Sequence, residues 1–281
     1  MKKINIRSLP SEREFIMYMT ECEKSRATIE KYARDVSCFF NCIKGRELNK
    51  NSVIEYKNML GEKFAASSAN SMIAALNTYL KFAKRPELCV KQFRVQRSVY
   101  CPEEKELCRA EYERLVKTAE KRGRKRLSLL IQTVCGTGIR VSELEFITVE
   151  AVRDGKARVN CKGKTRDIFI VKELRKKLLG YAKENKIGRG AIFVGRGGRP
   201  LCRCTVWREM KSLCAEARVN PQKVFPHNLR HLFARIFYSM EKDIVKLADI
   251  LGHTSINTTR IYIVTTGEEH RRKMENMRLI I

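Results

Sequence analysis

The residues of this chain that could do chemistry together lie in one stretch, which runs from His227 to Tyr262. Three of the four histidines of the chain fall in it, at positions 227, 231 and 253, and Arg230 stands between the first two. On a helix, His227 and Arg230 would share one face because they are three residues apart. An imidazole beside a guanidinium can hold one anion, and a phenol close to such cations can attack phosphorus. The stretch therefore predicts a phosphate site with a tyrosine nucleophile.

The residues around these groups indicate how they are positioned. Apolar side chains recur at a helical period over residues 243–251, and Gly252 is a suitable end for that helix, which leaves His253 just beyond it. A second short helix would begin at Ser255 and carry Tyr262. The histidine and the tyrosine would thus come from two consecutive helices.

Two motifs resemble those of the tyrosine recombinases, the phage-type integrases. The first is HNLRHLFA at residues 227–234, followed by LGHTSINTTRIY at residues 251–262. It is similar to the family pattern His-x-Leu-Arg-His, then Leu-Gly-His, then the nucleophilic tyrosine. The second, GTGIRVSEL at residues 136–144, resembles the family's Thr-Gly-hydrophobic-Arg-x-Ser-Glu-Leu box. Its two glycines allow a tight turn that would hold Arg140 at the start of the next helix.

The resemblance implies a catalytic set made of Arg140, Lys162, His227, Arg230, His253 and Tyr262. The two arginines would clamp the non-bridging oxygens of a scissile phosphodiester, and His253 would donate a hydrogen bond to the same oxygens. His227 would accept the phenol proton, and Lys162 would protonate the departing 5′-oxygen. Tyr262 would form a 3′-phosphotyrosine, which keeps the energy of the broken bond. Neither ATP nor a metal nor any other cofactor is expected.

Alternating apolar residues at 157–159 and 168–171 predict a β-hairpin with a basic tip. In the family, such a hairpin carries the lysine that protonates the leaving oxygen, and the family's Gly-Lys-Gly pattern favours Lys162. A cysteine replaces the first glycine and the loop is one residue short, so Lys164 stays an alternative. Lys164 and Arg166 are also expected to bind DNA.

Two further residues are expected to support the catalytic groups without taking part in the chemistry. Glu143 would orient the first catalytic arginine. His231 lies one position off the face that His227 and Arg230 share, which favours a buried structural histidine. Arg235 stands where the family usually has a small or hydroxylated residue, and it would either contact DNA or be exposed.

The composition of the chain predicts a nucleic-acid partner. Its 58 lysines and arginines against 31 acidic residues give a net charge of +27, and both halves of the chain are basic. A polyanionic partner is expected because each neutralised phosphate releases a counterion. Composition alone also fits a ribosome-associated basic protein, so the motifs decide in favour of DNA.

The eleven cysteines include no Cys-x-x-Cys pair and show no spacing typical of a zinc site. Thiols in this number indicate a reducing compartment. Charged residues from Arg7 onward interrupt any signal sequence, and no apolar run approaches the roughly 18 residues that cross a bilayer. The sequence therefore predicts a cytoplasmic protein without membrane contact.

The chain is long enough for two compact domains. Four apolar stripes at helical spacing occupy residues 10–83 and predict a helical, SAM-like core-binding domain over residues 1–84. A basic linker would follow over residues 85–104, with Arg94 and Arg97 lying along DNA. The first domain alone is weak support for the family, because many small helical domains show such stripes.

An α+β catalytic domain is expected over residues 105–266, so the predicted fold class is mainly α with a small β component. Residues 267–281 have the pattern of an amphipathic tail helix, which would dock on a neighbouring protomer or pack on its own domain.

The resemblance implies a site-specific recombinase that acts on double-stranded DNA carrying specific sites. It would be a monomer when free and a homo-tetramer on two DNA sites, with accessory DNA-bending proteins as possible partners. A type IB topoisomerase and a DNA-binding accessory protein without catalysis are the alternatives. The short spacing before Tyr262 and the helical first domain disfavour the topoisomerase, and the filled catalytic positions disfavour the silent protein.

Overall fold

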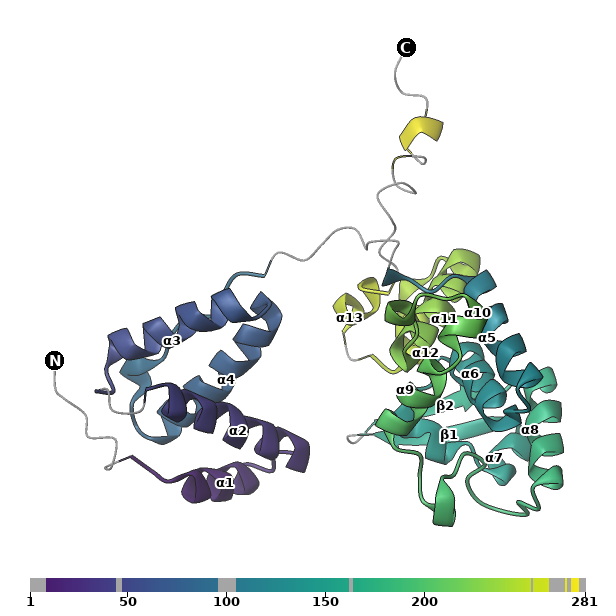
Figure 1. Ribbon diagram of the computed structural model, residues 1–281, viewed down its shortest axis with the longest axis horizontal. Coiled ribbons are helices and arrows are strands. Elements are labelled where there is room, and N and C mark those ends of the chain that lie inside the picture. The colour runs from purple at the N-terminus through teal and green to yellow at the C-terminus, as the bar shows by residue number, and fades with distance from the viewer. Residues whose placement is uncertain are drawn as a thin grey trace. The chain divides into compact units, whose positions relative to one another are not determined.

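The computed structural model of the chain describes residues 9–43, 47–95, 105–161, 164–253, 255–262, 271 and 274–277. The chain divides into two compact units, residues 1–97 and residues 98–281, whose elements are labelled in Figure 1.

The first unit is built from four helices, α1 (Glu12–Glu21), α2 (Arg26–Cys42), α3 (Lys50–Lys63) and α4 (Ala66–Phe82). Each helix turns an apolar stripe towards a common core, and Phe15, Phe39 and Leu76 are among its buried members. The sequence offers Ser25 as a cap of the second helix, and this is confirmed, since its side chain accepts from the backbone of Thr28. The caps that it offers for the next two helices, Asn51 or Ser52 and Ser67 or Ser68, are wrong by a few residues, because α3 begins after Asn49 and α4 after Ala65.

The segment that follows α4 packs against the first unit. It opens with the short helix η2 (Pro86–Leu88), and Val90 is buried in the helical core. The Asn77 side chain exchanges two hydrogen bonds with the backbone of Val90, and the Asn70 side chain does the same for Phe93. Of the two linker arginines expected along DNA, Arg94 is exposed and Arg97 lies outside the described residues.

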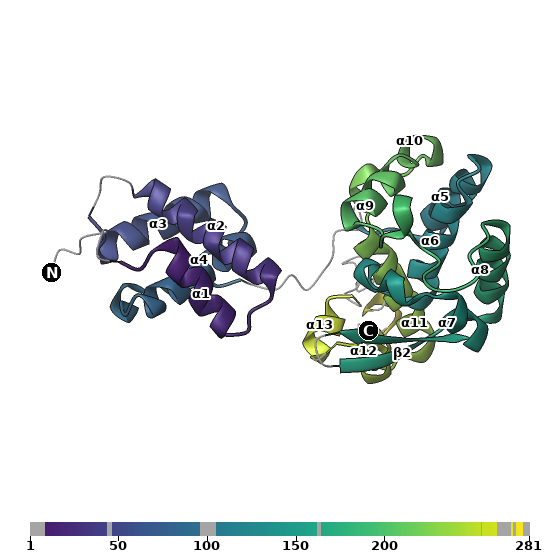
Figure 2. The same cartoon turned by 90° about the horizontal axis from the view of Figure 1, so that it is seen from below.

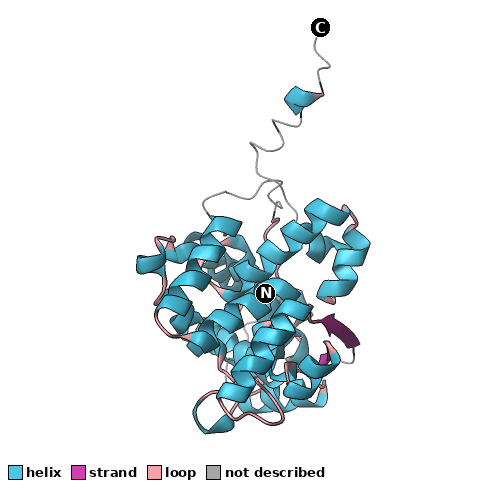
Figure 3. Cartoon of the chain, turned by 90° about the vertical axis from the view of Figure 1, so that its right-hand side faces the viewer, coloured by secondary structure: helices cyan, strands magenta, loops and turns pink. Residues whose placement is uncertain are grey.

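The second unit is also mainly helical, as the colours of Figure 3 show. Its elements are α5 (Arg109–Lys121), α6 (Lys125–Thr137), η4 (Val141–Phe146), α7 (Val149–Asp154), β1 (Lys156–Cys161), β2 (Lys164–Phe169), α8 (Lys172–Glu184), η5 (Arg196–Gly198), α9 (Arg203–Lys211), α10 (Cys214–Ala217), η6 (Pro221–Lys223), α11 (Pro226–Glu241), α12 (Ile244–Leu251) and α13 (Ile256–Arg260).

The expected hairpin is present as an antiparallel pair, in which Lys156 of β1 faces Phe169 of β2 and Cys161 faces Lys164. The sequence of the second unit also predicts a helix over residues 205–217 and a short strand at residues 192–194, and both details are wrong. The structure divides the first segment into α9 and α10, and in the second Val194 makes only an isolated bridge.

The helix α6 lies at the centre of the second unit, because its sequence is apolar on nearly all sides. Leu130, Ile131 and Val134 in it are fully buried, and α5, α8 and α11 pack around it. Figure 2 shows β2 beside α12, a pair of elements in contact. The turn after α6, the helix α11 and the end of α12 are thereby brought to one place, where the predicted site lies.

The predicted fold class, mainly α with a small β component, is confirmed. In the part of the chain that the structure describes, no helix combines the length and the apolar character needed to cross a membrane. The predicted tail helix falls largely outside the described residues; residues 274–276 form a turn of helix, and Met274 and Met277 are exposed.

Candidate active site

Arg140 is presented by a turn that only glycine can make. The helix α6 is followed by Gly138, whose φ of +64° is a left-handed conformation, and a Cβ there would lie 2.6 Å from the ring of Phe233. Arg140 is the residue just before η4, and Glu143 accepts from its backbone N–H at 2.9 Å and from its Nη1 at 2.8 Å. The Arg140 side chain keeps 38% of its surface exposed, so the guanidinium can still receive a ligand.

Arg230 is the most enclosed charged group of the site, with 1% of its surface exposed. Its Nη1 donates to the carbonyl of Gly138 at 2.5 Å, and its Nη2 donates to the carbonyl of Leu251 at 2.6 Å. Burial, and next the charge of Arg140, lower the pKa of Arg230 to about 10. The guanidinium therefore stays charged at neutral pH.

His253 follows Gly252, which ends α12 as the sequence predicts and has a left-handed conformation. Its Nε2 lies 3.1 Å from Arg230 Nη2, and its Nδ1 lies 2.9 Å from Thr259 Oγ1. Arginine has no acceptor, so Nε2 must accept here and Nδ1 must carry the proton. Burial, and then nearby cations with Arg230 foremost, lower the pKa of His253 to about 4, so the ring is neutral in the free protein.

Tyr262 closes the site just after α13 and is 5% exposed. Its hydroxyl lies 3.1 Å from Nε2 of His227. The ring of His231 stacks on the Tyr262 ring, with centroids 4.2 Å apart and planes 26° apart. His227 therefore fixes the direction of the Tyr262 hydroxyl, and the stacked His231 fixes the plane of the Tyr262 ring.

His227 lies in the first turn of α11 and is an exposed residue. Partial burial lowers the pKa of its ring, and the positive charges of Arg230, Arg203 and Arg140 lower it further. Because the ring is then neutral at neutral pH, its Nε2 can accept a proton from the hydroxyl of Tyr262. Arg203, at the start of α9, is a cation of this site that the sequence analysis does not name.

The structure describes the two candidate lysines of the hairpin to different extents. Lys162 lies outside the described residues. Lys164 begins β2, and only its backbone is described. The choice between the two as the proton donor therefore stays a prediction.

Two arginines considered above as DNA contacts bind partners within the protein, and whether they also contact DNA stays a prediction. Arg166 binds Glu143 at 2.5 Å and is 13% exposed. Arg235 is ion-paired with Glu106 and donates to the carbonyl of Leu107 at 2.5 Å. The Arg235 side chain is 28% exposed, and its two contacts anchor the segment that enters the second unit.

The alternation of side chains along a strand would have indicated that Arg166 faces the interior. In a strand, residues two apart face the same side, and Arg166 precedes the buried residues Ile168 and Ile170 by two and four positions. For Thr259 the sequence offers only its place in a helix. The carbonyls of Gly138 and Leu251 carry no signal in the sequence at all.

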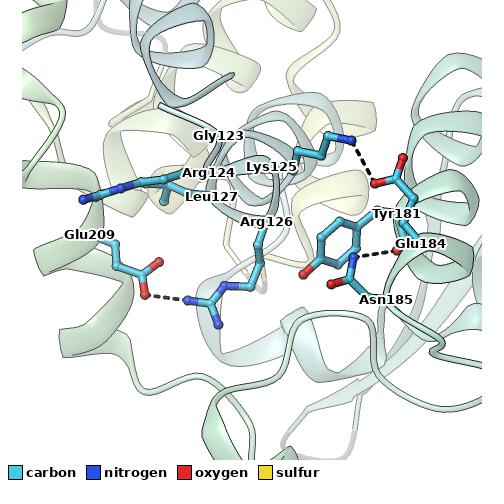
Figure 4. A pocket seen from close by; sticks show the side chains of 9 residues that line it. All are labelled: Gly123, Arg124, Lys125, Arg126, Leu127, Tyr181, Glu184, Asn185 and Glu209. Carbon is cyan, nitrogen blue, oxygen red and sulfur yellow. Dashed lines mark hydrogen bonds and ion pairs between the residues drawn. The ribbon is translucent and has the colours of Figure 1, made fainter. Parts of the chain in front are cut away.

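The second unit also has a cavity of about 660 Å³. Figure 4 shows it between the start of α6, the end of α8 and α9, with Arg126 paired to Glu209 and Lys125 to Glu184. None of the five described catalytic candidates lines it, and both of its carboxylates are already paired with cations of the same lining. The reactive groups lie elsewhere, around Tyr262.

Known protein families match both units of the chain. The phage integrase family matches residues 105–269, and the N-terminal SAM-like domain of phage integrases matches residues 13–87. A tyrosine recombinase XerA from Pyrococcus horikoshii is 30% identical over 277 residues, which are 95% of this chain and 93% of the relative.

Solved structures share the fold. A XerH site-specific recombinase in a post-cleavage complex with its difH substrate has a TM-score of 0.72 at 18% identity, over 94% of this chain and 84% of that one. A lambda integrase tetramer bound to a Holliday junction has a TM-score of 0.73 at 17% identity, over 93% of this chain and 78% of that one.

The chain belongs to the phage integrase family. It is a tyrosine-type site-specific recombinase, as the sequence motifs predict.

Proposed function

We propose that the protein cuts and rejoins DNA strands through a 3′-phosphotyrosine on Tyr262. The observation that carries the proposal is the placement of the Tyr262 hydroxyl 3.1 Å from Nε2 of the neutral His227, in a site that also holds Arg140 and Arg230. A base within hydrogen-bond distance of a nucleophile, next to fixed positive charge, is the arrangement that an in-line attack on phosphorus needs.

The two arginines stabilise the charge that builds on the non-bridging oxygens. Arg230 is fixed by the carbonyls of Gly138 and Leu251, and Arg140 is fixed by Glu143. Groups held in this way need little reorganisation when the pentavalent transition state forms. Two permanent cations at one phosphate supply the electrostatic stabilisation, so we expect cleavage to proceed in the presence of a metal chelator.

His253 must change its proton arrangement when the phosphate arrives. In the free protein its Nε2 accepts from Arg230, whereas a hydrogen bond to a phosphate oxygen requires a proton on Nε2. Phosphate oxygens draw the Arg230 donor away and raise the pKa of the imidazole, so Nε2 gains a proton. The phosphate itself thus completes the donor set.

Strand exchange by these steps needs no external energy source. The Tyr262 oxygen bonds to phosphorus as its proton passes to His227, and the P–O bond to the 5′-oxygen breaks. Lys162, with Lys164 as the alternative, gives a proton to that oxygen and leaves a free 5′-hydroxyl. Attack by a 5′-hydroxyl of a second strand reverses the steps, because the phosphotyrosine ester keeps the bond energy.

The functional assembly that we propose is a tetramer on two DNA sites, formed from monomers. The net charge of +27 supports a DNA partner, and the fold is shared with a lambda integrase that forms a tetramer on a Holliday junction. The first unit and the exposed Arg94 would contribute to DNA binding, and the tail would join protomers. The free thiols among the described cysteines fit a reducing cytoplasm.

The proposal is tested with a nicked DNA that carries the cognate site and loses the leaving strand after cleavage. Wild-type protein and Tyr262→Phe are incubated with it in a metal chelator and separated under denaturing conditions. A covalent protein–DNA band from the wild type alone is the expected result. Wild-type protein that binds this DNA and gives no covalent band would contradict the proposal and favour a DNA-binding accessory role.

A further inference from the structure

Arg166 of β2 binds two parts of the site that carry different reactive groups. Its Nη2 donates to Glu143 Oε2 at 2.5 Å, and its Nη1 donates to the carbonyls of Leu251 and, at 3.3 Å, Ile250. Only 13% of the side chain is exposed. The guanidinium thus spans from the η4 turn to the last turn of α12.

On the first side, Arg166 shares a carboxylate with Arg140. Glu143 accepts from Arg140 Nη1 through Oε1 at 2.8 Å, and its Oε2 accepts from both the Arg140 backbone and Arg166. The Glu143 side chain is 3% exposed, and a carboxylate that is so deeply buried requires paired positive charge. With Arg166 in place, the Glu143 side chain is held on both of its oxygens and stays aligned while it binds Arg140.

On the other side, Arg166 shares a carbonyl with Arg230. The Leu251 oxygen accepts from Arg230 Nη2 at 2.6 Å as well as from Arg166. Carbonyls at the end of a helix lack partners within the helix and carry partial negative charge. Arg166 also fills the space beside Gly252, where a Cβ would lie 2.7 Å from its Nη1. The peptide that leads to His253 is therefore fixed against Arg166.

We propose that Arg166 is a positioning residue that fixes the Arg140 turn relative to the end of α12, so that both catalytic arginines and His253 face one phosphate. The proposal rests on the proposed function of the site. Arg140 and Arg230 repel each other because both are cations. A bridge through Glu143 on one side and Leu251 on the other keeps them in the arrangement that the transition state needs.

Three variants separate this role from a DNA contact. Arg166→Ala removes the bridge, and Arg166→Lys keeps the charge but offers a single ammonium that cannot hold both partners. Arg158→Ala is the matched control, since Arg158 lies on the neighbouring strand β1, pairs with Asp167 of the hairpin and is 70% exposed. DNA affinity is measured in the Tyr262→Phe background, and single-turnover cleavage is measured at saturating nicked DNA.

A positioning role predicts that Arg166→Ala slows cleavage by about a hundred-fold with unchanged DNA affinity, because small misplacements of catalytic groups have effects of this size. Arg166→Lys should stay slow, and Arg158→Ala should cleave at the wild-type rate. The opposite pattern, weaker and less salt-dependent binding with cleavage restored by lysine, would identify Arg166 as a phosphate contact and overturn the proposal. If Arg166→Ala does not fold, Arg166→Lys decides between the two patterns.

A second measurement does not depend on catalysis. The melting of Arg166→Ala, Glu143→Gln and the double variant is compared with the wild type in the absence of DNA. If Arg166 and Glu143 act through one bridge, the two losses are not additive. Additive losses would contradict the bridge. Lack of covalent product from the wild type, with non-additive melting, would refute the proposed function and leave the bridge in place.

Discussion

The imidazole of His231 lies nearly parallel to the phenol of Tyr262, with ring centroids 4.2 Å apart. His231 follows Arg230 on α11, and its ring covers the tyrosine while His227 contacts the hydroxyl. Burial, and next the charge of His227, lower the pKa of His231 to about 4. The stacked ring is therefore uncharged at neutral pH and acts on the phenol by contact rather than by charge.

Replacement of His231 tests this contact. We expect His231→Ala to slow the formation of covalent product by ten- to a hundred-fold, because the nucleophile loses the surface that fixes its plane. His231→Phe keeps an aromatic face and should keep most of the rate. Single-turnover cleavage at saturating DNA measures both. An equal loss in the two variants would show that the imidazole has a chemical role instead.

The buried histidines also predict how stability depends on pH. The pKa values of His231 and His253 are about 4 in the folded protein, below the ordinary value of about 6.5 that applies after unfolding. Between these values the unfolded chain binds more protons, so the free energy of unfolding falls as the pH drops from about 6.5 towards 4. The stability is fully present above pH 6.5.

Thermal melting of the DNA-free protein at pH 7, 6, 5 and 4.5 measures this dependence. His231→Phe has one proton fewer to take up on unfolding, so its melting temperature should fall less steeply over this range. A slope unchanged by the substitution would mean that His231 is already protonated in the folded protein at these pH values.

Gly252 and Gly123 form a matched pair of substitutions. Both have a left-handed φ, +65° and +66°, but an added Cβ at Gly252 meets Arg166 while nothing lies within 4 Å of one at Gly123. Each alanine should cost about 1 kcal/mol of stability from the backbone alone. Only Gly252→Ala should also displace the Arg166 guanidinium and slow cleavage.

Chemical denaturation and single-turnover cleavage of the two alanine variants measure these effects. The comparison cancels the backbone contribution, so a difference in cleavage rate reports on the surroundings of Gly252. Equal cleavage rates for the two variants would show that the space beside Gly252 has no bearing on the reaction.

The hairpin lysines can be assigned with a modified leaving group. A DNA in which sulfur replaces the bridging 5′-oxygen needs no general acid, because a thiolate leaves without a proton. We expect Lys162→Ala to lose cleavage of normal DNA and to regain it on the sulfur-substituted DNA. Lys164→Ala should weaken DNA binding without this rescue. The reverse pattern would assign the acid to Lys164.

The sequence predicts the reactive groups of this site better than the framework that holds them. Its motifs place Arg140, Arg230, His253 and Tyr262 together, because each motif combines a reactive side chain with the turn that presents it. The glycine after α12 and the cap at Ser255 are confirmed for the same local reason. Local signals of this kind are fully contained in a few consecutive residues.

The contacts that fix these groups join residues far apart in the chain, and most of them escape the sequence. Arg166 is bonded to Leu251, and Arg230 to Gly138, through backbone carbonyls that every residue has. The sequence predicts only a structural role for His231. Its stacking partner Tyr262 is 31 positions away in the sequence, so no local pattern reveals the contact. Such relationships depend on how α11, α12 and α13 pack, which periodicity does not determine.

The nucleophile itself is the most direct test of this account. The covalent complex formed on nicked DNA is digested with nuclease and protease, and the peptide that carries the residual nucleotide is sequenced by mass spectrometry. We predict the nucleotide on Tyr262, joined through its 3′-phosphate. A nucleotide on any other of the nine tyrosines, or on another residue type, would contradict the proposed mechanism.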